Sequence, residues 1–175
     1  MIVIHPNDKT TEFLSVIYDK NNVKLLTEQD SNSKVRREIM SSDDIIMLGH
    51  GCNYGLLSRS SYKCFNRLIV NSSHVNFLRN KKCIGIWCNA NNFAEKYNLK
   101  GLFSGMIISE IEEAYYCNVE TSKEELEIEN KLFAERLSYC LKHFPLKDVP
   151  KEMKNLLTKE TPLTSFNYNN LFYYE

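Results

Sequence analysis

The sequence lacks an excess of charge of either sign. Its 175 residues include 22 Lys and Arg against 22 Asp and Glu, so the formal net charge is zero. Nucleic acids and anionic membrane surfaces attract clustered positive charge, and we therefore expect neither as a partner. The sequence also lacks an apolar run long enough to span a bilayer, and residues 1–6 lack a signal-peptide pattern. We expect a cytoplasmic protein.

Nucleotide-binding loops are absent as well. Neither a GxGxxG motif nor a P-loop occurs, and we expect no cofactor. Glycine is scarce, and all six glycines lie between Gly49 and Gly105. Because glycine serves where the chain turns sharply or approaches a ligand closely, this clustering places the tight turns around the suspected functional site.

Cysteine is present in a number that would allow three disulfides. Several cysteines lie within apolar, periodic segments, where an unpaired cysteine packs as a small hydrophobic residue. We therefore expect all six to be reduced: Cys52, Cys64, Cys83, Cys88, Cys117 and Cys140.

Strand and helix patterns alternate along the first two thirds of the chain. The strand patterns cover residues 1–5, 23–26, 45–51, 83–90 and 102–109, with a further possible strand at 67–70. Helical spacing or helix-capping residues mark residues 10–18, 33–40, 73–79 and 91–101, and an acidic helix start follows at 110–113. Such alternation predicts an α/β fold, a three-layer sandwich with a mainly parallel central sheet.

The last third of the chain lacks this alternation of strands and helices. A long amphipathic helix is predicted over residues 122–143 and a shorter helix over 151–157, while the aromatic segment 166–174 has the composition of an edge strand. No linker interrupts the chain. We expect a single domain over residues 1–175, with a core of 1–115 and C-terminal helices and an edge strand over 116–175.

Two apolar runs each end in a reactive side chain. The run IIMLGHG covers residues 45–51 and has His50 next to its end, and the run CIGIWCNA covers residues 83–90 and contains Cys88. In open α/β sheets the functional groups collect beyond the carboxyl ends of the strands. If the two strands are neighbours, an imidazole and a thiol face one crevice, which is the minimum requirement for nucleophilic catalysis by cysteine.

These residues resemble the caspase-like cysteine peptidases, the group that includes caspases, gingipains, clostripain and separases. In that group one strand ends in a His-Gly pair, here His50-Gly51, and the next ends in the nucleophilic cysteine, here Cys88. The order of the preceding strands and helices also agrees. The resemblance covers roughly residues 1–115 and implies a caspase-like topology and cleavage of a peptide or protein substrate.

The resemblance implies a role for each of these residues. Cys88 would attack the peptide carbonyl, His50 would protonate the leaving amine, and the backbone N–H groups of Gly51 and Cys88 would hold the oxyanion. The bulky Trp87 departs from the small or acidic residue usual before the cysteine. Strand alternation places Trp87 on the face opposite Cys88, where we expect it to pack under a helix.

Further polar residues are candidates for substrate binding. Glu110 and Ser109 would leave the next strand at the same edge, where Glu110 could pair with a basic substrate side chain. By resemblance to the clostripain-like branch, Glu110, Glu112 and Glu113 could form an acidic pocket for Lys or Arg, although acidic residues in a first helical turn are also stabilised by the helix dipole. Asn89 could orient the substrate or cap a helix.

A metal site formed by His50, Cys52, His74, Cys83 and Cys88 is disfavoured, because the odd spacing of Cys83 and Cys88 on one strand points their side chains to opposite faces. We therefore expect no metal site.

The sequence alone supports more than one function. The first is a cysteine-dependent peptidase with a catalytic Cys88/His50 pair. The alternatives are a non-catalytic caspase-like protein-interaction domain and a flavodoxin-like domain that binds a small molecule in the same crevice. The substrate and the oligomeric state are not indicated.

Overall fold

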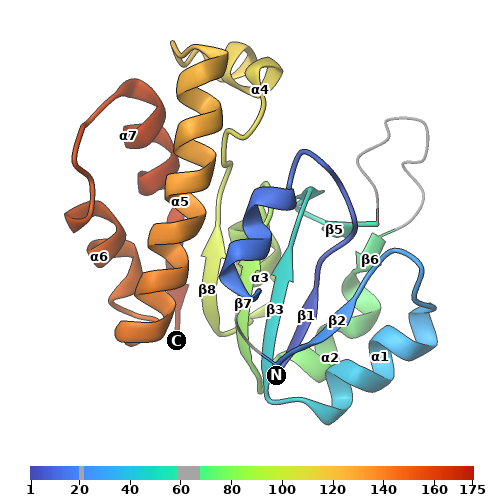
Figure 1. The fold of residues 1–175 in the computed structure, drawn as a ribbon. Coiled ribbons are helices and arrows are strands. Elements are labelled where there is room, and N and C mark those ends of the chain that lie inside the picture. The colour runs from blue at the N-terminus through green and yellow to red at the C-terminus, as the bar shows by residue number, and fades with distance from the viewer. Residues whose placement is uncertain (20–21, 59–67) are drawn as a thin grey trace.

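The structure is a computed structural model that describes residues 1–19, 22–58 and 68–175. A six-stranded sheet lies at the centre of the fold, with helices on both faces (Figure 1). Its strands are β1 (Ile2–Ile4), β2 (Lys24–Leu26), β3 (Asp44–Leu48), β7 (Lys82–Ile86), β8 (Gly101–Ser104) and β9 (Leu171–Tyr174). The helical elements are η1 (Glu12–Ile17), α1 (Asn32–Ser41), η2 (Ser72–His74), α2 (Val75–Leu78), α3 (Ala90–Tyr97), α4 (Ile111–Tyr116), α5 (Lys123–His143), α6 (Val149–Asn155) and α7 (Pro162–Asn169).

The strands follow the order β2-β1-β3-β7-β8-β9 across the central sheet. The first five are parallel to one another, and only β9 runs antiparallel, against β8. Parallel strands bring their carboxyl ends to one edge of a sheet. The predicted α/β fold with a mainly parallel sheet is therefore confirmed.

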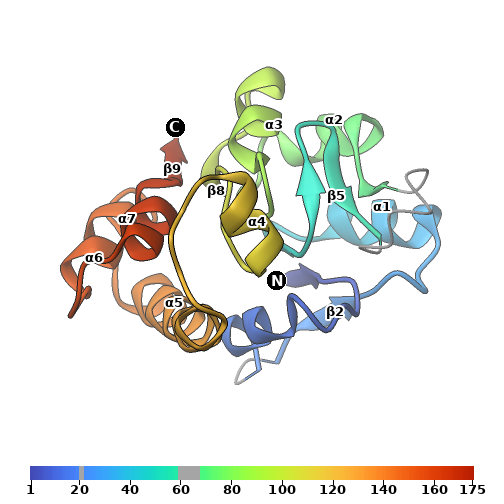
Figure 2. The ribbon, with the colours of Figure 1, turned by 90° about the horizontal axis from the view of Figure 1, so that it is seen from above.

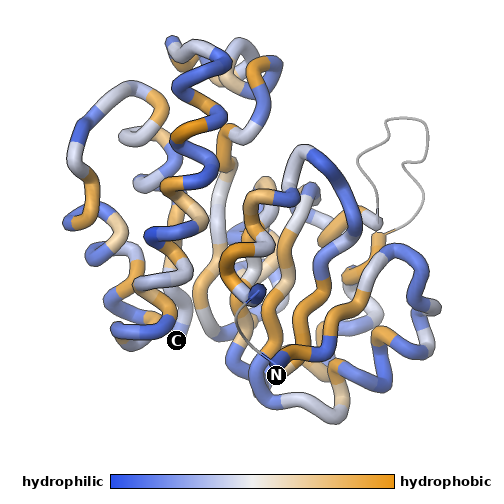
Figure 3. Tube along the Cα trace, in the orientation of Figure 1, coloured by the Kyte–Doolittle hydropathy of each residue, from blue (hydrophilic) through white to orange (hydrophobic). Residues whose placement is uncertain are grey.

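Alternating side chains along each strand enter two separate cores. In β3, Ile45 and Met47 face the core covered by α1, α2 and α3, while Ile46 and Leu48 face the core covered by η1, α5, α6 and α7 (Figure 2). Burial on both faces explains why the strands are nearly continuous apolar runs, as Figure 3 shows. Residues at odd and even positions of a strand thus pack against different helix layers, one on each face of the sheet.

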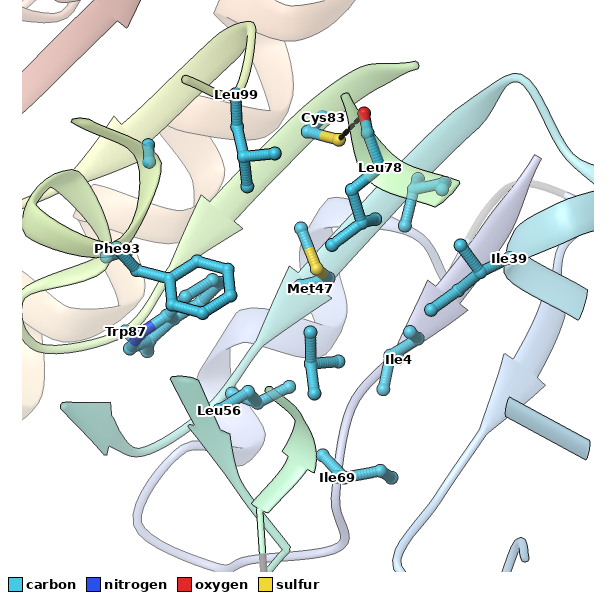
Figure 4. Close-up of a cluster of buried hydrophobic side chains, with 14 of the residues drawn as sticks. Ile4, Ile39, Met47, Leu56, Ile69, Leu78, Cys83, Trp87, Phe93 and Leu99 are labelled. Carbon is cyan, nitrogen blue, oxygen red and sulfur yellow. Dashed lines mark hydrogen bonds between the residues drawn. The ribbon is translucent and has the colours of Figure 1, made fainter. Parts of the chain in front are cut away.

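Trp87 belongs to the first of these cores. The indole is 2% exposed and packs edge to face against Phe93 of α3, with ring centroids 5.9 Å apart. Figure 4 shows the two rings together, with Met47 and Leu56 in the same cluster. The expectation that Trp87 packs under a helix is confirmed.

A small antiparallel sheet adjoins this core. It consists of β4 (Gly51–Cys52), β5 (Gly55–Leu57) and β6 (Leu68–Val70). The Trp87 indole N–H donates to the Cys52 carbonyl at 3.1 Å, which ties this sheet to the end of β7. The chain that follows His50 is held in this way against the chain that precedes Cys88.

Several predicted elements differ from those observed. The strand expected over residues 102–109 ends at Ser104, and residues 166–169 belong to α7, so only 171–174 form the edge strand β9. The helix predicted over 91–101 is α3, which covers Ala90–Tyr97 and has Asn89 as its N-cap. Arg67, at the start of the strand predicted over 67–70, lies outside the described residues. Cys64 also lies outside them, and the five cysteines that the structure describes are free.

The observed helices include the 21-residue α5. Among the described residues, no helix combines the length and the apolar character needed to cross a membrane.

Candidate functional site

His50 and Cys88 follow neighbouring strands of the central sheet. β3 and β7 pair in parallel with Leu48 opposite Ile86, so each of the two residues lies two positions beyond this pair. The Gly49 amide donates to the Ile86 carbonyl at 3.1 Å and extends the pairing toward the site. The predicted adjacency of the two strands is confirmed.

A buried serine holds the turn that carries Cys88. The Ser104 hydroxyl of β8 accepts from the Trp87 amide at 3.0 Å and donates to the Trp87 carbonyl at 2.8 Å. Next to Cys88, Asn89 has a φ of 66°, a left-handed conformation that turns the chain into α3, and its amide donates to the Gly105 carbonyl at 3.1 Å. The backbone around Cys88 is therefore held from both sides.

The Cys88 thiol faces two acceptors. Its Sγ lies 3.8 Å from the Ile107 carbonyl and 3.8 Å from Oε1 of Glu113. Burial, and secondly the Glu113 carboxylate, raise the pKa of the Cys88 thiol to about 12. In this arrangement the thiol is protonated at neutral pH and is not an activated nucleophile.

Glu113 is held in place by the chain that enters α4. Its Oε2 accepts from the Ser109 amide at 2.8 Å, the Ser109 hydroxyl at 3.1 Å and the Glu110 amide at 3.2 Å. Asn130 of α5 donates to the Ser109 carbonyl at 2.9 Å and anchors the same segment. Glu113 therefore accepts hydrogen bonds at the N-terminus of α4 with Oε2 and contacts the Cys88 thiol with Oε1.

His50 is oriented by a hydrogen-bonded chain from the segment after β1. Its Nε2 lies 2.6 Å from the Thr10 hydroxyl oxygen, and that hydroxyl donates to Oδ1 of Asp8 at 2.8 Å. Because a hydroxyl has only one proton to donate, Nε2–H must be the donor in the bond between His50 and Thr10. In the neutral imidazole, the lone pair is then on Nδ1.

The His50 ring lies beside two carboxylates. One ring nitrogen of His50 and one carboxylate oxygen each of Glu110 and Glu113 lie within 4.8 Å of one another. Burial raises the pKa of Glu110, proximity to His50 opposes this, and the Glu113 carboxylate adds to it. Among the described residues no hydrogen bond joins His50 directly to Cys88; instead, both lie near Glu113.

The remaining predicted site residues lie around this group. Gly51 has no room for a side chain, because a Cβ there would lie 2.1 Å from Cδ1 of Trp87. Ser109 donates to Glu113, and Asn89 forms the turn into α3. The proposed oxyanion role of the Gly51 and Cys88 amides and the substrate roles of Glu110, Ser109 and Asn89 stay predictions.

Three residues of the site, Asp8, Thr10 and Ser104, were not singled out by the sequence. Ser104 gave no signal. Asp8 precedes the helical pattern over 10–18, and Thr10 was expected only as a cap at its start. Glu113 was expected only as part of an acidic substrate pocket or of a helix start, although a glutamate three residues after an N-cap often reaches back to that residue's amide. The sequence does not indicate that its second oxygen faces Cys88.

Comparison of the chain with protein-family models, with curated proteins and with solved structures found no match. The functional argument therefore rests on the residues of this chain.

Proposed function

We propose that the protein is a cysteine-dependent peptidase in which Cys88 is the nucleophile and His50 the acid-base group. The observation that carries the proposal is the position of both residues, each two residues beyond the paired Leu48 and Ile86 of adjacent parallel strands. A caspase-like topology for the central sheet is part of the same proposal. The strand order supports it, since β8 lies beside β7 and continues the sheet as that topology requires.

The proposed reaction begins when His50 takes the proton of the Cys88 thiol. The sulfur then attacks the carbonyl carbon of the peptide, while the Gly51 and Cys88 amides stabilise the oxyanion. The carbon–nitrogen bond breaks as His50 returns the proton to the amine. Water hydrolyses the thioester, releases the acid and restores the thiol.

The described conformation is a latent form of the proposed enzyme. The Glu113 carboxylate lies against the thiol and opposes formation of the thiolate, because two negative charges at this separation repel. Activation therefore requires Glu113 to move away from Cys88. Such a movement has to break the three hydrogen bonds that hold its Oε2.

Peptide cleavage tests the proposed reaction. Fluorogenic peptides with Arg, Asp or Leu before the scissile bond should be cleaved at least about tenfold faster by Glu113→Gln than by the wild type. Adding Cys88→Ala or His50→Ala to Glu113→Gln should abolish cleavage. Glu110→Gln in the same background should lower the preference for Arg by about tenfold or more, because a charge-assisted contact contributes about 1.5–3 kcal/mol. Cleavage that survives Cys88→Ala, or no cleavage by Glu113→Gln, would contradict the proposal.

A second function is a non-catalytic caspase-like domain that binds a protein partner. The observation in its favour is the contact between the Cys88 thiol and Oε1 of Glu113 at 3.8 Å, which together with burial raises the pKa of the thiol to about 12. In that case Glu113 is a permanent structural partner of the thiol, and its replacement leaves Cys88 unreactive. The peptide assay distinguishes the two functions.

A further inference from the structure

We propose that His50, Glu110 and Glu113 form a binding site for a zinc ion. Their ligand atoms lie within 4.8 Å of one another, and all three side chains are half-buried. Imidazole nitrogens and carboxylate oxygens are both zinc ligands, and zinc sites with three protein ligands hold a water molecule as the fourth.

Hydrogen bonds outside the proposed ligand shell orient two of the three ligands. Nε2–H of His50 is bonded to Thr10, which in turn donates to Asp8, so the lone pair of Nδ1 remains for a metal ion. Metal-binding histidines commonly donate their second ring N–H in this way. Oε2 of Glu113 accepts three hydrogen bonds, so Oε1, which faces the Cys88 thiol at 3.8 Å, would be the oxygen that binds the metal ion.

The charges of the site favour a cation. Within the described part of the chain, neither Glu110 nor Glu113 forms an ion pair with a lysine or arginine. Two adjacent, half-buried carboxylates repel each other, and a divalent cation would remove that cost. The imidazole ligand favours zinc over magnesium and calcium, which prefer oxygen ligands only.

The three ligand atoms have to move slightly closer together when zinc binds. Tetrahedral zinc with ligand distances near 2.1 Å holds its ligand atoms roughly 3.4 Å apart. The observed limit of 4.8 Å leaves at most about 1.4 Å to close, which rotation of the flexible glutamate side chains can supply.

A bound zinc ion would also regulate the proposed peptidase. It would occupy the lone pair that His50 needs to accept the thiol proton, so the metal-bound form would be inactive. This consequence rests on the proposed function, whereas the metal site itself does not.

Zinc titration of the chelator-treated protein tests the site. Calorimetry and competition with a chromophoric chelator should show one zinc site, and magnesium should not compete for it. His50→Ala, Glu110→Gln and Glu113→Gln should each weaken zinc binding by about tenfold or more. Thermal unfolding followed by circular dichroism would show that each variant is folded, and Glu110→Gln leaves the hydrogen bonds to Oε2 of Glu113 in place.

Matched controls separate this site from other zinc binding. The exposed Glu112 is the neighbour of Glu113, and Glu112→Gln should retain full affinity, as should Cys88→Ala and Cys52→Ser. No zinc binding, or binding that only the cysteine variants weaken, would overturn the proposal. Zinc binding with the expected variant pattern but without peptide cleavage would uphold the site and reject only the peptidase.

Discussion

His5 is an enclosed histidine at the carboxyl end of β1. Its Nδ1 lies 3.0 Å from the Tyr18 hydroxyl and its Nε2 lies 3.3 Å from the Thr11 hydroxyl, and the residue is 6% exposed. Burial lowers the pKa of His5 to about 4, because the charged imidazolium loses its hydration. The neutral ring thus joins β1 to the segment that positions Thr10 beside His50.

This pKa predicts a loss of stability in acid. Between about pH 6.5 and pH 4 the unfolded chain holds a proton on His5 that the folded chain does not, so lowering the pH through this window favours unfolding. The contribution amounts to about 3 kcal/mol of the free energy of unfolding. Urea unfolding at pH 7 and pH 4 measures it, with His5→Gln as the comparison.

The His5→Gln variant should lose about 3 kcal/mol less than the wild type between these two pH values. His74, whose pKa is also lowered chiefly by burial, titrates in both proteins and cancels in the comparison. An equal loss in the two proteins would show that His5 is not the titrating group.

At the scale of the elements, β8 supports the Cys88 turn through Ser104. This serine is 0% exposed and bonds both the amide and the carbonyl of Trp87. The site therefore depends on a residue of the neighbouring strand as well as on β7.

Ser104→Ala should destabilise the protein by about 1–3 kcal/mol, because it leaves the buried Trp87 amide without its acceptor. The Trp87 amide should also exchange its hydrogen faster, since its acceptor is lost. Chemical denaturation and hydrogen exchange measure the two effects. Ser33→Ala, at an exposed position of α1, should change stability by less than about 0.5 kcal/mol. A Ser104→Ala variant as stable as Ser33→Ala would refute the role of this serine.

The elements also show where sequence patterns were sufficient. Continuous apolar runs predicted β3 and β7 because their side chains are buried on both faces. The apolar segment after Ser104 was wrongly assigned to the strand, because Ile107 and Ile108 are buried outside the sheet. The amide of Ile108 donates to the side chain of Asn167, a tertiary contact that no local pattern reveals.

At the scale of the whole molecule, the alternation of strands and helices predicted the parallel sheet and the adjacency of the His50 and Cys88 strands. The interior of the site depends on contacts between distant segments. Thr10 reaches His50 across 40 residues, and Glu113 reaches Cys88 across 25. Such contacts arise because α4 and the segment after β1 pack over one edge of the sheet. The periodic pattern of apolar residues along the sequence does not predict this packing.

The central claim is that Cys88 becomes a nucleophile assisted by His50 once Glu113 is removed from the thiol. Removing the carboxylate lowers the pKa of Cys88, so a larger fraction is thiolate at neutral pH. The rate at which iodoacetamide alkylates Cys88, read by mass spectrometry at pH 7.5 with a chelator present, measures this directly.

The account predicts slow alkylation of Cys88 in the wild type and in the matched control Glu112→Gln. Glu113→Gln should accelerate it by about tenfold or more, equivalent to at least one pKa unit, and His50→Ala in the same background should slow it again. Alkylation of Cys88 that Glu113→Gln does not accelerate, or that is equally fast without His50, would contradict the account.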